Sequence, residues 1–481
     1  MRFENSFEQN EKTFKTAFDR DDVFKFKRIC NQHNPTLKIA VALINCLVSS
    51  DIVDRDIIKP LTVNPVSDDI TVAEMQAICV HSTSIETDAT KAMNSVASGD
   101  CAVLIGDNPA VIIIDTKGMK QRDVSAPETE LSVAGPSEGF NENIMTNLSL
   151  VKKRIMTPNF KNEFIWSGKQ SNSVYCICYI DGIVKPEVVN RLKTRLEKID
   201  MDYLGDINYI AETIRDNKSS FIKTYGKTNR PDVLASKLLE GRIGIILNGS
   251  PTALTLPFLF IENFQTPDDY YINCWYANVG RTLRLIGFWL AVTVPATYLS
   301  VILHHKSILP PEWLYSISVS QTGVPLPSFL EMIVLFAVFE ILRETGARMP
   351  SSIGLALNIV GAIILGQAAV EAKLVSAPMV IIVAFSGVTG LMVYDLKGVV
   401  FYLRGILIIF SAIAGIPALS LGLTLFLLLL FNMSSLGIPF MYVSSVLYSE
   451  GNNDTFFRAP VYKMNYRQRR FTDNIKRQGK V

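Results

Sequence analysis

Apolar residues are unevenly distributed along the chain, and the long apolar runs begin only near residue 285. Before that point, short apolar runs alternate with stretches of helical periodicity, which favours an α/β or α+β arrangement over an all-β or helical-repeat one. The chain has 481 residues, which is too long for one ordinary core. The pattern therefore predicts an α/β region followed by a polytopic α-helical membrane domain.

Several segments of the first region carry strand and helix signals. Cys101–Gly106 and Pro109–Asp115 are short apolar runs on either side of the turn pair Asp107-Asn108, and they predict a β-hairpin. Strands are also expected over Ser173–Ile183 and Arg242–Leu247.

Val188, Leu192, Leu196 and Ile199 recur at helical spacing, which predicts an amphipathic helix over Glu187–Ile199. Pro127–Asn143 is rich in Gly, Pro, Ser, Glu and Asn, as is typical of a linker or an exposed functional loop. We place a division between two α/β subdomains after this stretch. The predicted organisation comprises subdomains at residues 1–150 and 151–275, a multi-span helical membrane domain at 276–445 and a basic tail at 446–481.

Leu285–Leu303 is an uncharged run of 19 residues, long enough to cross a hydrocarbon core of about 30 Å. Arg281 and Arg284 precede it and place its beginning, with the whole first region, on the cytoplasmic side. Further spans are predicted at Ile353–Ala372, Ala377–Tyr394 and Gly405–Phe431. The last contains Gly415-Ile-Pro417, which is expected to kink or break the helix.

Phe329–Leu342 is a shorter run that contains two acids, and it predicts a short or re-entrant helix. Counting it as a span gives five crossings and puts the basic tail outside, against the positive-inside rule. Two alternatives restore the parity: Gly405–Phe431 folds back at Pro417, or Ile243–Phe264 enters the membrane.

Polar residues in two of these segments are candidates for function. In Ile353–Ala372 the pore or interhelical candidates are Asn358, Gln367 and Glu371, beside the small residues Gly361 and Gly366. Small residues permit close helix approach, and buried polar side chains need a partner helix or water. Interhelical hydrogen bonding and a water-lined path or subunit interface both remain open.

A second set of candidates forms a charge cluster at a predicted membrane boundary. Its members are Glu331, Glu340, Arg343, Glu344 and Arg348. Glu340 and Glu344 share one helical face, and Arg343 lies within reach of Glu340 at a spacing of three residues. Both an ion-pairing role and a gating role are open.

Charge and motif content narrow the functional classes. The net charge of +2 arises from 47 basic and 45 acidic residues, so it indicates no affinity for nucleic acid. Seven cysteines form no zinc-finger pattern, and no phosphate loop, GxGxxG, HExxH, GxSxG or EF-hand motif is present. We therefore expect no enzyme, no metal and no cofactor. The charged start without an apolar h-region predicts no cleavable signal peptide.

Short phrases spread in order over about residues 125–440 resemble the GerA family of spore germination proteins. In the soluble region they are Gly135-Pro136 through Gly139-Phe140 to Asn147, Arg230-Pro231-Asp232, Glu240-Gly241-Arg242, Gly249-Ser250-Pro251 and Pro267-Asp268-Asp269-Tyr270-Tyr271. In the membrane region they are Leu342-Arg343-Glu344-Thr345-Gly346, Gly366-Gln367-Ala368-Ala369-Val370 and Ser435-Leu436-Gly437-Ile438-Pro439. The ordered set is more specific than any single phrase.

The resemblance implies the A subunit of a nutrient germinant receptor in the inner membrane of a bacterial spore. Its expected partners are a transporter-like B subunit, a lipoprotein C subunit, further copies of itself in a ring, and the lipid bilayer. Family A subunits look like oligomeric, nutrient-gated cation channels whose cytoplasmic region resembles two substrate-binding-protein-like subdomains. The alternatives are a stage V accessory protein that aids ion or dipicolinate release, a solute transporter, and a non-conducting receptor scaffold.

Overall fold

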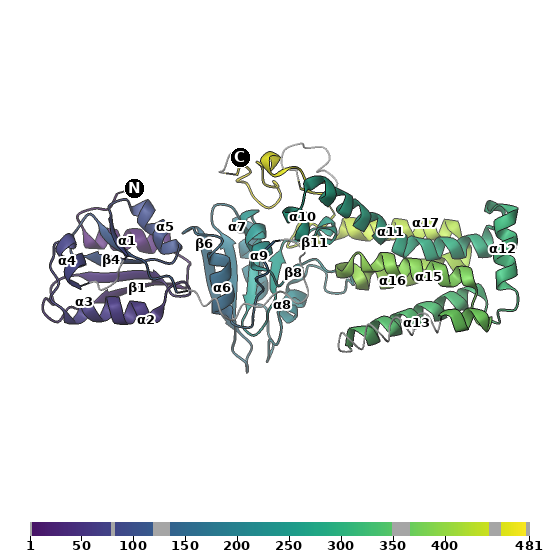
Figure 1. The fold of residues 1–481 in the computed structure, drawn as a ribbon, viewed down its shortest axis with the longest axis horizontal. Coiled ribbons are helices and arrows are strands. Elements are labelled where there is room, and N and C mark those ends of the chain that lie inside the picture. The colour runs from purple at the N-terminus through teal and green to yellow at the C-terminus, as the bar shows by residue number, and fades with distance from the viewer. Residues whose placement is uncertain (1, 78–81, 119–134, 349–365, 442–453, 478–481) are drawn as a thin grey trace.

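The computed structural model describes residues 2–77, 82–118, 135–348, 366–441 and 454–477. Two sheet domains and a helical bundle follow one another along the longest axis of the molecule (Figure 1). We name them the first sheet domain (residues 2–118), the second sheet domain (135–272) and the bundle (273–432), and we call residues 454–477 the tail. The predicted fold class, an α/β region followed by helices, is confirmed.

The first sheet domain is built on a five-stranded sheet in the order β1-β2-β4-β5-β3, in which every pair is antiparallel. The strands are β1 (Phe24–Ile29), β2 (Ile39–Ile44), β3 (Thr83–Glu86), β4 (Cys101–Ile105) and β5 (Val111–Ile114). β4 and β5 pair with Cys101 opposite Ile114, so the predicted hairpin is confirmed. All their residues are buried, since helices cover both faces of the sheet.

Two groups of helices cover this sheet. They are α1 (Phe7–Ala17) and α5 (Ala89–Ala97) on one face, and α2 (Ser50–Ile52), η1 (Val53–Ile58), α3 (Lys59–Val63) and α4 (Ile70–Ala77) on the other. The alternation of β4 explains the two cores, because Ala102 and Leu104 face the first group whereas Cys101, Val103 and Ile105 face the second.

The second sheet domain repeats this topology with the strand order β6-β7-β9-β10-β8, again antiparallel throughout. The strands are β6 (Phe160–Ser167), β7 (Ser173–Ile180), β8 (Gly226–Thr228), β9 (Ile243–Leu247) and β10 (Ala253–Leu256). β7 and β9 are the strands predicted from the apolar runs near residues 173 and 242. The alternative that Ile243–Phe264 enters a membrane is wrong, because this stretch forms the hairpin β9–β10.

Helices cover both faces of the second sheet as well. α6 (Ile144–Lys152) and α9 (Pro231–Leu239) lie on one face, and α7 (Pro186–Leu196) and α8 (Ile207–Ile214) lie on the other. α7 is the amphipathic helix that the spacing predicted. The boundary predicted near residue 150 falls inside α6. After the sheet, η2 (Phe260–Phe264) and α10 (Asp268–Tyr271) lead to the bundle.

The two sheet domains share one continuous core, in which α1 and α5 of the first domain and α6 and α9 of the second take part. A buried ion pair lies in the same contact, with Lys152 Nζ 2.6 Å from Asp21 Oδ2. Asp21 also forms a bridge with Asn162 of β6. Shared apolar burial and a fully paired charge make the two domains one body.

The bundle consists of long helices that run along the molecular axis and one short helix across its far end (Figure 1). They are α11 (Cys274–His304), η3 (Lys306–Ile308), α12 (Pro311–Gln321), α13 (Ser328–Arg348), α15 (Ala377–Leu391), η4 (Tyr394–Leu396), α16 (Lys397–Ala414) and α17 (Ile416–Asn432). Cys274–His304 and Tyr394–Ala414 are long and apolar enough to cross a membrane, while α15 and α17 are apolar but shorter.

Two predicted segments of the bundle differ from the structure. Gly405–Phe431 is not one kinked span, because α16 ends at Ala414 and α17 returns beside it, with Gly422 packed against Leu407. The alternative that the chain folds back near Pro417 is confirmed. Phe329–Leu342 is not a short helix, since α13 continues to Arg348; its last turns are charged, so an apolar run underestimates its length.

The tail, which contains η6 (Val461–Lys463), packs against the second sheet domain. Arg467 Nε donates to the Leu239 carbonyl at 2.7 Å, and Arg477 pairs with Glu240 at 2.6 Å. The sheet domain lies at the end of the bundle where α11 begins, so the tail and the sheets are on the same side (Figure 1). The five-crossing count put the tail on the side opposite the sheets, which these contacts contradict; that count treated the stretch of α16 and α17 as one span.

The reversal at Gly415 generates a prediction. Gly415 has φ +66° and ψ −141°, a conformation that suits only glycine, and an added Cβ would lie 2.8 Å from His305 Nε2. Gly415→Ala should therefore lower the stability of the detergent-solubilised chain by about 1–3 kcal/mol, measured by thermal unfolding.

Gly405→Ala is the matched control, because Gly405 lies inside α16 and, in the described part of the chain, no atom lies within 4 Å of an added Cβ. It should leave stability unchanged or raise it by up to about 1 kcal/mol. Equal stability of the two variants would contradict the role assigned to Gly415.

Candidate functional site at the junction of sheet and helices

The chain leaves α17 through a short hairpin that inserts into the second sheet domain. β11 (Ser434–Ser435) pairs antiparallel with β12 (Ile438–Pro439), and the turn residues Leu436 and Gly437 have φ +49° and +79°. Two such residues are what a two-residue type I′ turn requires. Leucine adopts this conformation only at a cost, which burial offsets: Leu436 is 2% exposed and belongs to the core around Tyr225 and Leu256.

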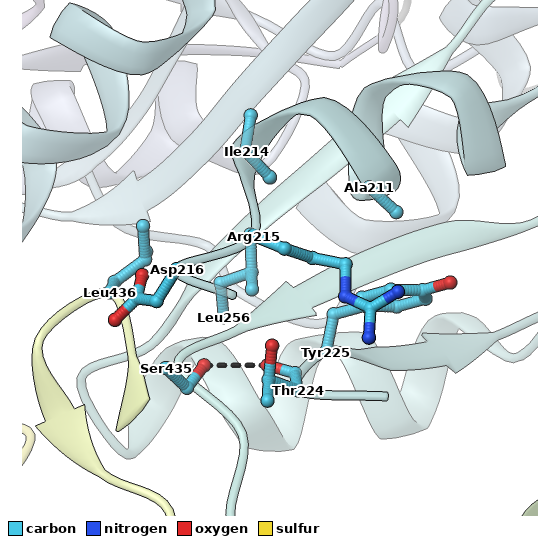
Figure 2. Close-up of a pocket in the computed structure, with 9 residues that line it drawn as sticks. All are labelled: Ala211, Ile214, Arg215, Asp216, Thr224, Tyr225, Leu256, Ser435 and Leu436. Atoms are coloured by element: carbon cyan, nitrogen blue, oxygen red, sulfur yellow. Dashed lines mark hydrogen bonds between the residues drawn. The ribbon is translucent and has the colours of Figure 1, made fainter. Parts of the chain in front are cut away.

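Hydrogen bonds hold the hairpin in place (Figure 2). Ser435 Oγ donates to the Thr224 carbonyl at 2.6 Å and accepts from the Phe258 N–H at 3.0 Å. Arg191 of α7 donates from Nη1 to the Leu436 carbonyl at 2.7 Å. The space left beside these groups is about 10 Å³, room for no more than one water molecule. The hairpin is therefore a packed contact rather than a ligand pocket.

Asp216 is the charged centre of this contact. Its carboxylate accepts from the Gly437 N–H at 2.9 Å, and Ser434 Oγ and Arg195 Nη1 also donate to it. Burial by itself raises the pKa of Asp216, but the hydrogen bonds from Ser434, Arg195 and Gly437 outweigh it and hold the pKa below its ordinary value. The ionised carboxylate thus links α7, α8 and the end of α17.

A second buried charge group joins β9 to η2. The Arg242 and Glu262 side chains are 2% and 3% exposed, with Arg242 Nη1 2.5 Å from Glu262 Oε1. Lys237 Nζ lies 2.5 Å from Glu262 Oε2, and Glu262 Oε1 also accepts from the Leu259 N–H. Burial raises the pKa of Glu262, but the charges of Arg242 and Lys237 outweigh this effect and keep it below its ordinary value.

A third charge group connects α10, the first turns of α11 and the tail. Asp269 Oδ2 lies 2.9 Å from Arg281 Nε, and Asp269 Oδ1 lies 2.5 Å from Arg284 Nη2. Arg281 Nη1 reaches Asp454 of the tail at 2.7 Å, and the Tyr270 hydroxyl donates to the same carboxylate at 2.6 Å. Arg281 and Arg284, which mark the beginning of the predicted span, therefore both form ion pairs with Asp269.

The loop that carries the first family phrase packs onto the same region. Gly135 has φ +106°, and an added Cβ would lie 2.6 Å from the Tyr271 ring. The Pro136 carbonyl accepts from Arg230 Nη2 at 2.9 Å, and Arg230 pairs with Asp232 at 2.8 Å. Tyr271 donates its hydroxyl to Asp232. The family phrases that begin at Gly135, Arg230 and Pro267 therefore contact one another around Arg230.

The rest of the loop is anchored in the second sheet domain. Gly139 and Phe140 are buried, and the Phe140 N–H donates to the Asn229 carbonyl at 2.7 Å. Asn147 is fully buried in α6, where Oδ1 accepts from the Asn141 N–H at 2.8 Å and Nδ2 donates to the Asn141 carbonyl at 2.5 Å. These contacts fix a loop conformation.

The predicted charge cluster is divided among separate contacts. Glu340 pairs with Arg343 on α13 and with Arg404 of α16 at 2.9 Å. Arg404 is buried, lies 3.9 Å from the centre of the Phe336 ring and is within 3.3 Å of Ser386 Oγ. Sequence reasoning missed Arg404 because it follows an apolar run with no local acid.

The other members of the cluster lie elsewhere. Glu331 is buried near the beginning of α13 and accepts from the Ser376 N–H at 2.5 Å and from its hydroxyl at 2.7 Å. Glu344 and Arg348 form an exposed pair at 2.6 Å. The structure thus brings only Glu340 and Arg343 together with Arg404.

Among the pore candidates, Asn358 and Gly361 lie outside the described residues. Residues 366–371 are helical, and within them Gln367 and Glu371 are exposed while Gly366 is half-buried, with no atom of the described residues within 4 Å of an added Cβ. The pore assignment stays a prediction.

Three family phrases had no role assigned from the sequence: Glu240-Gly241-Arg242, Pro267-Asp268-Asp269 and Ser435-Leu436-Gly437. The structure places all of them at the junction. In the described part of the chain, His, Cys, Asp and Glu side chains form no group of three or more that could hold a metal ion.

Known proteins resemble this chain over most of its length. The family model described as Bacillus/Clostridium GerA spore germination protein matches residues 12–470. Spore germination protein KA of Bacillus subtilis (strain 168) is 34% identical over 428 residues, 88% of this chain and 78% of that protein. Uncharacterized membrane protein YfkQ of the same organism is 32% identical over 431 residues, 89% of this chain and 84% of that protein.

The solved structures include one similar domain. The crystal structure of the N-terminal domain of the A subunit of the Bacillus megaterium spore germinant receptor GerK3 covers 54% of this chain and 98% of that chain, with 23% sequence identity and a TM-score of 0.40.

The environment of Asp216 predicts a pH dependence. Because its pKa is lower in the folded chain than the value of about 3.9 in an unfolded one, the stability it contributes is complete above that value and is lost as the pH falls through the folded pKa. Asp216→Asn should lower stability by about 1–3 kcal/mol at pH 7, and the difference from the parent should shrink below about pH 4.

Thermal unfolding of the full chain at pH 7 and at pH 3.5 measures both quantities. Asp202→Asn, at an exposed acid of the same domain, should match the parent at both values. A difference between Asp216→Asn and the parent that does not change with pH would contradict the assignment.

Proposed function

The chain belongs to the Bacillus/Clostridium GerA spore germination protein family, and from this premise we propose that it is the A subunit of a nutrient germinant receptor in the spore inner membrane. The name of one relative, spore germination protein KA, supports the role in germination, and the name of YfkQ supports a membrane protein. No enzymatic step is part of this proposal.

In the proposed topology the bundle crosses the membrane several times and both sheet domains are cytoplasmic. Two helices of sufficient length and apolarity support this arrangement. The basic residues Arg281 and Arg284 lie in the first turns of α11, before its long uncharged run, and the basic tail lies on the same side as the sheets. Both features agree with the preference of lysine and arginine for the cytoplasmic side.

Copies of the chain assemble into a ring that conducts monovalent cations. Gln367 and Glu371 support this proposal, because both are exposed in the single chain and lie on one helical face. Such side chains are costly in lipid, so a second copy or a water-filled axis must cover them. A ring of identical helices supplies both.

In this proposal, conformational changes reach the ring through the junction between the second sheet domain and the bundle. The observation that supports this part is the insertion of the hairpin β11–β12 into the second sheet domain. Leu436 is buried in the sheet domain core two residues after β11 begins, and β11 directly follows α17. In the complex with a transporter-like B subunit and a lipoprotein C subunit, nutrient binding would rearrange these partners. It would open the ring only if the nutrient binds the open and closed states of the complex with different affinity.

A non-conducting scaffold is the second candidate. The close packing and paired charges of the junction are compatible with a rigid subunit that holds the other subunits in place. They are equally compatible with a subunit that changes conformation. The two candidates differ in one property, conductance.

The channel proposal is tested by ion flux and single-channel recording of the chain in liposomes with its B and C partners and an amino-acid germinant. Gln367→Leu should abolish or strongly reduce the nutrient-dependent cation flux, because it removes a polar group from the proposed water-lined face.

Thr424→Leu is the matched control, since Thr424 is an exposed residue on α17 whose hydroxyl donates to the Ser420 carbonyl of its own helix. Its flux should equal that of the parent. A complete, nutrient-responsive complex that shows no conductance would contradict the channel proposal and favour the scaffold.

A further inference from the structure

A cavity of about 610 Å³ lies between the second sheet domain, α10 and the tail. β8, α9 and η2 form its walls on the sheet side, and tail residues including Arg458 and Gln468 close it from the other side. Volumes of this size are typical of sites for small molecules. Tyr225 lines both this cavity and the packed hairpin contact, so the two adjoin, whereas no described residue of the predicted pore helix is in the lining.

The charge of the lining is unevenly compensated. Seven basic and five acidic side chains line the cavity. Four of the acids, Asp232, Glu240, Glu262 and Asp454, already pair with an arginine or lysine at 2.8 Å or less.

Several of the cations have no such partner. Arg458 and Arg467 direct their guanidinium groups to backbone carbonyls, and Lys223 forms no ion pair with the described residues. The net field inside the cavity is therefore positive.

Parts of the arginine side chains in the lining are closed off from the cavity. The Nε atoms of Arg242, Arg458 and Arg477 are inaccessible to solvent and therefore do not face the open space. Arg242 and Arg458 are only 2% and 5% exposed. Arginine nevertheless attracts an oxyanion through its charge, and oxyanions are the acceptors that it binds best.

We propose that this cavity binds a small oxyanion, a carboxylate or a phosphate group, held by the uncompensated charges of Arg458, Arg467 and Lys223. The Tyr270 and Tyr271 side chains in the lining provide contacts for a ring or apolar part of the same molecule. The site does not depend on whether the chain conducts ions.

The oxyanion has two possible sources. Asp395, in the turn that precedes α16, belongs to the lining, so the cavity lies at the end of the bundle nearest the sheets. A free solute and the headgroup of an anionic phospholipid present the same chemistry there. The experiment must therefore separate these sources.

Inorganic phosphate and citrate are titrated by calorimetry into the full chain in an uncharged detergent, at constant ionic strength set with chloride. A second arm compares thermal stability in nanodiscs of phosphatidylglycerol and of phosphatidylcholine. Saturable binding of phosphate or citrate indicates a solute, whereas stabilisation by phosphatidylglycerol alone indicates a headgroup; either result supports the site.

Lys223→Gln should weaken the binding about three- to tenfold, since it removes one charge from the lining. Arg477→Gln should also weaken it, because it removes a charge from the lining and leaves Glu240 without its partner at 2.6 Å. Lys218→Gln, at an exposed lysine of the same domain outside the lining, is the matched control and should bind like the parent. Absence of binding in both arms, or binding that neither Lys223→Gln nor Arg477→Gln reduces, would overturn the proposal.

Discussion

The structure depends on one insertion, that of the Leu436 side chain into the core of the second sheet domain. Burying a leucine contributes about 1.5–3 kcal/mol, which offsets the cost of about 1–2 kcal/mol for its left-handed backbone. Asp216 fixes the same turn through the Gly437 N–H. Because only Met433 separates α17 from β11, this insertion attaches the last helix of the bundle to the sheet domain.

Buried charges define the rest of the junction. Arg242 with Glu262 and Arg281 with Asp269 are almost inaccessible to solvent, and such pairs stabilise a fold little compared with apolar groups of the same size. Removing one partner leaves a buried charge, however, so each pair specifies one arrangement. Asp454 extends this network to the tail, which therefore forms part of the junction.

Sequence patterns predicted the elements better than their meeting points. The hairpin β4–β5 was predictable because two apolar runs flank a strong turn pair, and the reversal near Pro417 was one of two stated alternatives. The side on which the tail lies was not predictable, because one missed reversal changes whether the number of predicted spans is odd or even. Asp216 and Ser434 are 218 residues apart, and no local signal relates them. The phrases at the junction were recognised, but their roles depend on contacts between distant segments.

Nutrient-triggered germination of spores that carry the Leu436→Ala variant tests the coupling through the junction most directly. Immunoblotting of spore membranes verifies equal amounts of each variant, and Leu425→Ala on the exposed face of α17 serves as the control. The account predicts that Leu436→Ala accumulates but responds weakly or not at all, while Leu425→Ala responds like the parent. A normal response of Leu436→Ala at normal abundance would contradict the account.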